Sequence, residues 1–146
     1  GAAAVAFRRL GFAVQPQEDG CLALEAEEGR ALVALAASEA AIESDPYWVL
    51  VRRFEDESEP PAGIIVGNAW RARPPGEREA PFSDLLRRGA EHRGLCLLAT
   101  TELHAALAAV ITRPDDAALR HALRQALLDG IGPCTLRPLL DGGDSG

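Results

Sequence analysis

The residues best equipped for chemistry in this sequence are arginines that gather beside a tryptophan. Residues 69–93 carry six Arg against four acids, whereas residues 15–60 carry three Arg against twelve acids. A guanidinium group binds phosphate through paired N–H donors, and an indole ring stacks on a base. The segment therefore predicts a site for an anion, a nucleotide or a nucleic-acid backbone. Its candidate residues are Asn68, Trp70, Arg71, Arg73, Arg78 and Arg87.

The overall charge favours a structural interpretation of the same residues. The chain of 146 residues has a formal net charge of −7, and all fifteen of its cationic side chains are Arg. Proteins that coat nucleic acid or an anionic membrane use broad positive surfaces, which this composition does not provide. We therefore expect Asn68 and Arg78 to tie the loop together and Trp70 to cover the edge of a sheet. Nucleotide or nucleic-acid binding stays as the alternative.

The cysteines and histidines lack the spacing of a metal or disulfide site. Without CxxC or CxxH patterns, neither a zinc cluster nor a disulfide framework is predicted, and we expect free thiols. The histidines fall on separate predicted helices with no paired nucleophile, which predicts surface side chains. These residues are Cys21, Cys96, Cys134, His92, His104 and His121. The neighbouring aromatics Tyr47 and Trp48 are expected to anchor the core or an interface.

Hydrophobic periodicity and breaker residues divide the chain into strands and helices. Apolar runs between turn signals predict strands over 12–15, 21–26, 31–35, 64–66 and 95–98. Amphipathic spacing predicts helices over 2–10, 45–57, 84–93, from Thr100 or Thr101 through Val110, and from about 114 to Gly130. We expect Asp45 as the N-cap of the second helix, Ser83 as the cap of the third, and Thr100 or Thr101 as the cap of the fourth.

The order of these elements predicts an α/β fold. An antiparallel front half leads into a strand–helix–strand unit, which indicates a mixed sheet flanked by helices, with further helices at the C-terminal end. We expect one domain over residues 1–140 and a flexible tail over 141–146. No apolar run reaches the roughly 18 residues that span a bilayer, and no secretion signal is evident, so we expect a cytoplasmic location without membrane contact. The start without Met suggests a segment of a longer polypeptide.

Four short phrases occur along the chain in a fixed order. They are LGF at 10–12, GIIVGN at 63–68, PPGER at 74–78 followed by Pro81-Phe82, and LCLLATT at 95–101 followed by Leu103. Prokaryotic members of the PD-(D/E)XK nuclease superfamily carry similar phrases, which read GILVGN, PPEER..PF and CLLTT..L. The chain resembles that superfamily over about residues 5–112. The resemblance implies a restriction-endonuclease-like fold.

The same resemblance implies a metal site that this sequence has lost. Active members carry an acidic residue on the first strand of a hairpin and Glu-x-Lys on the second, because carboxylates bind Mg²⁺ and the lysine positions the attacking water. Ala34 and Ala36 stand at the two positions on the second strand, the position on the first strand falls at Leu22 or Ala23, and the chain contains no Lys. We therefore expect no catalysis, no metal and no cofactor. The acids nearby are expected to be solvated surface groups; they are Asp19, Glu25, Glu27, Glu28, Glu39 and Glu43.

Three functions follow from these patterns, in order of preference. The first is a catalytically inactive nuclease-like domain that serves as an assembly or recognition module, with other domains of its parent protein, another protein or a second copy as partner. The second is non-catalytic binding of a nucleotide or nucleic acid through the arginine-rich loop. The third is a Mg²⁺-dependent nuclease with a relocated site.

Overall fold

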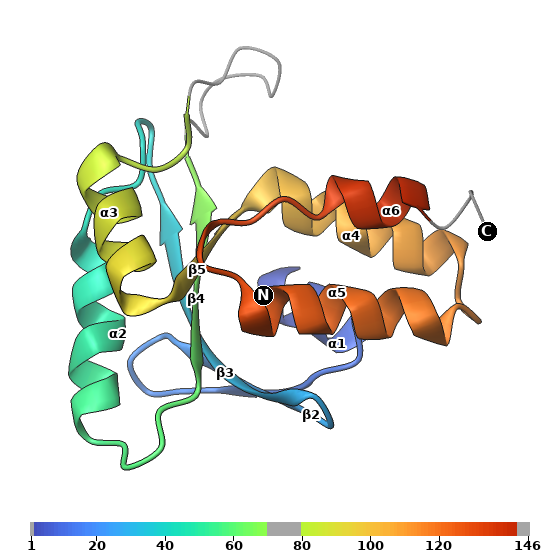
Figure 1. Cartoon of the computed structure of the whole chain (residues 1–146), viewed down its shortest axis with the longest axis horizontal. Coiled ribbons are helices and arrows are strands. Elements are labelled where there is room, and N and C mark those ends of the chain that lie inside the picture. Colours follow the sequence, from blue (N-terminus) through green and yellow to red (C-terminus); the bar gives the residue numbers. More distant parts are fainter. Residues whose placement is uncertain (1, 70–79, 143–146) are drawn as a thin grey trace.

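The computed structural model describes residues 2–69 and 80–142 of the chain. A six-stranded sheet stands between two layers of helices (Figure 1). The strands are β1 (Ala13–Pro16), β2 (Leu22–Ala26), β3 (Gly29–Ala37), β4 (Ala62–Asn68), β5 (Leu95–Ala99) and β6 (Gly132–Pro133). The helices are α1 (Ala2–Arg9), α2 (Asp45–Glu55), α3 (Asp84–Arg93), α4 (Thr100–Thr112), α5 (Ala117–Asp129) and α6 (Arg137–Gly142).

The sheet is mixed, as the sequence predicted. Its strands lie side by side in chain order, from β1 at one edge to β6 at the other. The first three strands pair antiparallel, and the pairs β3–β4, β4–β5 and β5–β6 are parallel. Parallel neighbours need a crossover, and α2 and α3 supply two of them. The α/β class and the flanking helices are therefore confirmed.

Two hydrophobic cores lie on opposite faces of the sheet. One face is covered by α2 and α3, and the other by α1, α4, α5 and α6 (Figure 1). Alternate residues of β4 separate the two cores, because Ile65 packs towards α2 and α3 while Ile64 and Val66 pack towards the other helices. Burial on both faces explains why β4 and β5 are continuous apolar runs.

Glycines at both ends of the apolar run in β4 allow close packing over this strand. A Cβ added to Gly63 would lie 2.5 Å from Leu95 and 3.0 Å from Phe54. A Cβ added to Gly67 would lie 2.8 Å from both Ile42 and Phe82. The phrase GIIVG therefore has a packing reason, since larger residues would push the covering side chains off the strand.

The helix starts were predicted with mixed success. Ser83 caps α3 by accepting a hydrogen bond from the backbone N–H of Leu86 at 3.2 Å, as predicted. Asp45 was wrongly predicted as a cap, because Ser44 holds the N-cap position and Asp45 is the first residue of α2. The cap predicted at Thr100 or Thr101 is also wrong, since Ala99 holds the N-cap position of α4. The hydroxyl of Thr100 donates instead to the carbonyl of Gly67 at 2.8 Å.

The C-terminal part differs most from the sequence prediction. Strand β6 is only two residues long, and its pairing with β5 depends on contacts between distant parts of the chain rather than on a local pattern. Helix α6 was not predicted, and it includes the backbone of residues 141 and 142, which were expected to belong to a flexible tail. Residues 143–146 lie outside the described part of the chain.

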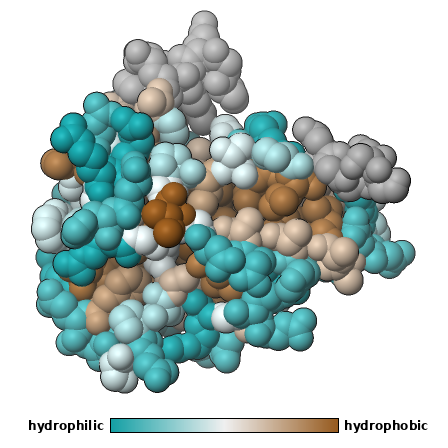
Figure 2. Space-filling view, viewed as in Figure 1, coloured by the Kyte–Doolittle hydropathy of each residue, from teal (hydrophilic) through white to brown (hydrophobic). Residues whose placement is uncertain are grey.

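Apolar surface remains at this end of the molecule. Figure 2 shows it where α5 and α6 lie side by side, with Leu139 and Leu140 only half-buried. Of the helices within residues 2–69 and 80–142, none combines the length and the apolar character that crossing a membrane requires.

Candidate functional site

The region that the nuclease resemblance singles out is a shallow pocket between the hairpin and the start of α2. It has a volume of about 290 Å³. Its lining includes Asp19, Cys21, Ala34, Ala36, Asp45 and Val49. Ala34 and Ala36 are alternate residues of β3, so their side chains share the face of the sheet that α2 covers. The two methyl groups offer neither charge nor lone pairs to a cation.

Leu22 does not belong to this pocket, which decides between the two first-strand positions, Leu22 and Ala23, that the sequence left open. It pairs with Val33 across the hairpin, and both side chains pack in the core on the opposite face. Ala23 is opposite Leu32, which lies in the same core as Ala34. The first-strand position on the pocket face is therefore Ala23 rather than Leu22, because side chains alternate between faces at each residue.

Asp19, at the rim of the pocket, is already engaged. Its carboxylate accepts a hydrogen bond from the guanidinium of Arg53 at 2.6 Å and another from the backbone N–H of Cys21 at 3.1 Å. The hydrogen bond from Arg53 lowers the pKa of the Asp19 carboxyl below its ordinary value. This pair joins α2 to the turn before β2. Asp19 was expected to be a solvated acid, and its ion pair is an addition to that expectation.

The carboxylates near the pocket do not make a metal site in the described structure. Glu25, Glu27, Glu39 and Glu43 are exposed, as expected for solvated acids. Within residues 2–69 and 80–142, no three Asp, Glu, His or Cys side chains gather closely enough to hold a metal ion.

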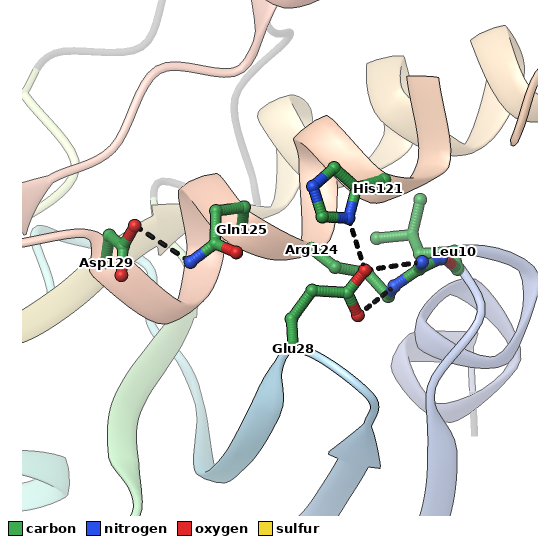
Figure 3. A network of polar contacts seen from close by, with 6 residues as sticks. All are labelled: Leu10, Glu28, His121, Arg124, Gln125 and Asp129. Carbon is green, nitrogen blue, oxygen red and sulfur yellow. Dashed lines mark hydrogen bonds and ion pairs between the residues drawn. The ribbon is translucent and has the colours of Figure 1, made fainter. Parts of the chain in front are cut away.

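Glu28 departs from the predicted pattern of solvated acids, because its side chain is only 3% exposed. Figure 3 shows it at the tip of the β2–β3 hairpin, pointing at α5. Its two oxygens accept from Nε and Nη2 of Arg124, each at 2.7 Å. Nδ1 of His121 lies 2.5 Å from the same carboxylate, and Nη1 of Arg124 donates to the carbonyl of Leu10 at 2.8 Å. The hydrogen bonds from Arg124 lower the pKa of Glu28 to about 2.

This cluster, which we name the Glu28 clamp, joins three distant segments. It comprises Glu28, His121, Arg124 and the carbonyl of Leu10. Arg124 occupies both carboxylate oxygens, so the charge is held in a fixed bidentate geometry. The arrangement suits a structural clamp. Nothing in the local sequence around Glu28 indicates it, because its partner Arg124 lies 96 residues further along the chain.

A second hollow on the face of α2 lies beside the edge strands. It has a volume of about 440 Å³, and its lining includes Gln15, Arg30, Arg53 and Glu57. Arg53 is paired with Asp19, and Arg30 donates to the carbonyl of Glu59 at 3.3 Å. The cations of this hollow are thus engaged with groups of the protein itself.

The arginine-rich candidate site is only partly within the described structure. Trp70, Arg71, Arg73 and Arg78 lie outside the described residues. Asn68 ends β4, and its carbonyl accepts from the backbone N–H of Ser38 at 3.0 Å. Arg87 is exposed on α3, where it pairs with Asp84 one turn earlier.

The neighbouring aromatics predicted as anchors take separate roles. Tyr47 is half-buried and lies over α3, where a Cβ on Gly89 would be 3.1 Å from its ring. Trp48 remains 53% exposed and meets Tyr47 edge to face, with ring centroids 5.0 Å apart. Leu85, four residues before Gly89 on α3, is 68% exposed. Tyr47 is therefore part of the core boundary, and Trp48 faces outwards.

Comparison of the chain with protein-family models, with curated proteins and with solved structures finds no match.

Proposed function

We propose that this protein is a catalytically inactive, nuclease-like domain that acts by binding another protein or a second copy of itself. The restriction-endonuclease-like fold is part of this proposal. It is supported by the element order, in which a helix precedes three antiparallel strands and a crossover helix then leads to a parallel strand. The order agrees with the phrases in the sequence that resemble the superfamily.

The observation that carries the proposal is the lining of the pocket beside α2. A metal-dependent nuclease needs carboxylates to hold the cation and a base to position water. Ala34 and Ala36 place methyl groups there, and Cys21 beside them has a thiol whose pKa is raised to about 11, chiefly by burial. The pocket also has two carboxylates in its lining, Asp19 and Asp45, but they come from the turn before β2 and from α2, and Asp19 is already paired with Arg53. The two β3 positions therefore give a cation no ligand to replace its water shell.

Exposed aromatic surface supports a role in binding. Trp48 leaves half of a large apolar side chain in water, and Leu85 on the adjacent helix is even more exposed. Tryptophan is enriched at the centres of protein interfaces, because it buries a large area while losing little conformational entropy. We therefore place the contact surface on the outer sides of α2 and α3, around Trp48.

A nuclease assay tests the inactivity. The purified chain is incubated with supercoiled plasmid and either Mg²⁺ or Mn²⁺, and we expect no nicking above a protein-free control. Metal-dependent cleavage that co-purifies with the protein and is absent with a chelator would refute the proposal and favour a relocated active site.

Binding is tested with the chain's own fluorescence. The sequence has two Trp, so a Trp70→Phe variant leaves Trp48 as the single tryptophan reporter. Light scattering over a range of concentrations reports self-association, and we expect the emission of Trp48 to shift to shorter wavelength as the partner removes it from water. Trp48→Ala is expected to weaken the association, with exposed His104→Ala on the other layer as the matched control. A chain that stays monomeric, and that also binds no candidate partner protein, contradicts the assignment.

The alternative function, binding of a nucleic acid through the arginine-rich loop, can be tested with the same protein. Of its described members, Arg87 is paired with Asp84, and Asn68 uses its backbone carbonyl within the fold. Titration with a labelled oligonucleotide at low salt is expected to show no saturable binding. Salt-sensitive binding that weakens in an Arg71→Ala, Arg73→Ala double variant would favour the nucleic-acid function instead.

A further inference from the structure

Two cysteines that lie far apart in the sequence meet at the β5–β6 edge of the sheet. The sulfur atoms of Cys96 and Cys134 are 2.7 Å apart, and both thiols are free. A disulfide bond measures about 2.05 Å, so only a small movement separates this contact from a covalent bond. The spacing of the cysteines gave no hint of the pair, because it arises from the pairing of β6 with β5.

The backbone holds both residues in place. Cys96 in β5 is opposite Gly132 of β6, and Leu97 is opposite Pro133. The N–H of Cys134 donates to the carbonyl of Leu97 at 2.8 Å, which extends the pairing by one residue. The thiols therefore do not depend on a mobile loop to approach each other.

A missing side chain makes room for the pair. A Cβ added to Gly130, at the end of α5, would lie 2.2 Å from the sulfur of Cys134 and 3.0 Å from that of Cys96. Any residue with a side chain at this position would displace the sulfur of Cys134. The space above the two thiols is thus set by a glycine whose own φ of −64° is ordinary for any residue.

The two thiols are not equivalent. Cys96 is fully buried, whereas Cys134 is half-buried and lies between the exposed residues Pro133 and Thr135. The thiol of Cys96 donates a hydrogen bond to the sulfur of Cys134, which lowers the pKa of Cys134. That hydrogen bond, together with burial, raises the pKa of Cys96. Cys134 is therefore both the more accessible thiol and the one that ionises first.

We propose that Cys96 and Cys134 are a reversible thiol–disulfide site that reacts with hydroperoxides. The sulfur of Cys134 attacks the peroxide, an S–O bond forms, the O–O bond breaks, and the alcohol or water leaves with the thiol proton. The sulfur of Cys96 then attacks that of Cys134, the S–O bond breaks, and water leaves with the proton of Cys96. Two thiols lose two electrons to the peroxide. An external dithiol then reduces the protein disulfide to two thiols by exchange and leaves as its own disulfide.

The bond would fasten the C-terminal part of the chain to the sheet. Strand β6 contributes only two residues to its ladder, and the residues after it lead into α6. The linked cysteines are 38 positions apart, so the bond closes a loop that contains α4 and α5. Closing a loop of this length removes conformational freedom from the unfolded chain, and oxidation should raise the melting temperature.

Peroxide treatment followed by alkylation and mass spectrometry tests the proposal on the intact chain. Hydrogen peroxide should protect two thiols from alkylation, give a peptide pair that links Cys96 to Cys134, and lose both effects after dithiothreitol. Cys21 should still be alkylated after unfolding, because it is buried on the other face of the sheet with its pKa raised to about 11. Cys21→Ser is the matched control and should oxidise like the wild type.

A Gly130→Ala variant tests whether the reaction depends on the position of the two thiols. It keeps all three cysteines but moves the sulfur of Cys134, so we expect disulfide formation to slow several-fold. If this variant does not fold, Cys134→Ser replaces it and should leave Cys96 unoxidised. Unchanged alkylation of Cys96 and Cys134 after peroxide, a link between two chains, or equal rates in Gly130→Ala and wild type would each overturn the proposal. These outcomes do not depend on the proposed binding function.

Discussion

The two faces of the sheet are closed by different means. On the face of α2 and α3, side chains lie close over glycines, and a shallow pocket remains open. Phe82, in the segment before α3, lies over Gly67 of β4, and Tyr47 of α2 lies over Gly89 of α3. On the other face, four helices enclose the larger core, and the Glu28 clamp fastens α5 to the hairpin. Close contact with backbone fixes one layer, whereas apolar volume and a bidentate ion pair fix the other. The pocket lined by Ala34 and Ala36 belongs to the first layer.

The largest losses of stability should come from substitutions that leave a cavity in either hydrophobic core. Leu123 of α5 and Leu86 of α3 are both almost completely buried. Leu123→Ala should lower the free energy of unfolding by about 3 kcal/mol or more, and Leu86→Ala by less, since a layer of two helices can relax into the space. Urea denaturation of both variants measures the difference. Equal losses would contradict the unequal closure of the faces.

Overpacking at β4 should have the next largest effect. In Gly67→Ala the new methyl group meets Ile42 and Phe82 at distances no side chain tolerates, so the free energy of unfolding should fall by about 1–3 kcal/mol. Adding Phe82→Leu, which removes the ring, should recover part of this loss. Thermal unfolding of the two single variants and the double variant measures this recovery. If the loss of stability in the double variant equals the sum of the two single losses, the added methyl group does not meet Phe82.

The Glu28 clamp should make stability depend on acid. The pKa of Glu28 is about 2 in the folded chain against an ordinary value of 4.5. A lowered pKa means that its contribution is complete above about pH 4.5 and is lost as the pH falls towards 2. Glu28→Gln should therefore lower the melting temperature at neutral pH by several degrees. The melting temperature of this variant should also decrease less than that of the wild type as the pH falls from about 4.5 to 2. Exposed Glu27→Gln is the control and should change neither the melting temperature at neutral pH nor its dependence on pH. Equal changes in the Glu27 and Glu28 variants would mean that the Glu28 clamp is not the cause.

The smallest effect should come from the exposed pair on α3. Arg87 and Asp84 lie three residues apart on one helix, and both side chains are well exposed. Such pairs add little to stability, because water screens them and long side chains lose entropy. Arg87→Ala should leave the midpoint of urea unfolding within error of the wild type. A clear loss would mean that Arg87 makes a further stabilising contact on the face of α3.

Local patterns were enough to predict strands β1 to β5 and helices α1 to α5. Apolar runs such as residues 95–98 and the cap at Ser83 depend on neighbours in sequence, and they were predicted correctly. The two-residue strand β6 was not predicted, because it forms by pairing with the edge of β5 and has no apolar run of its own. Helix α6, too short for a clear periodicity, was missed for a similar reason.

The site was less predictable than the fold. Alternation along the hairpin could place Ala34 and Ala36 on one face, but it did not fix the register that puts Leu22 on the other. In the sequence Glu28 does not differ from its exposed acidic neighbours, and only the packing of α5 places Arg124 beside it. The contact between Cys96 and Cys134 likewise needed the sheet order. The last two contacts join residues that are 96 and 38 positions apart, which no local pattern encodes.

The sheet ends in a proline on each side, and this limits how chains can join. Strand β1 is four residues long and finishes at Pro16, while β6 consists of Gly132 and Pro133. A proline has no N–H to donate, and so short an edge offers a newcomer few backbone partners. Strand-by-strand growth into fibres is therefore disfavoured at both edges of the sheet. Any oligomer of this protein should be built from side chains and should dissociate without unfolding.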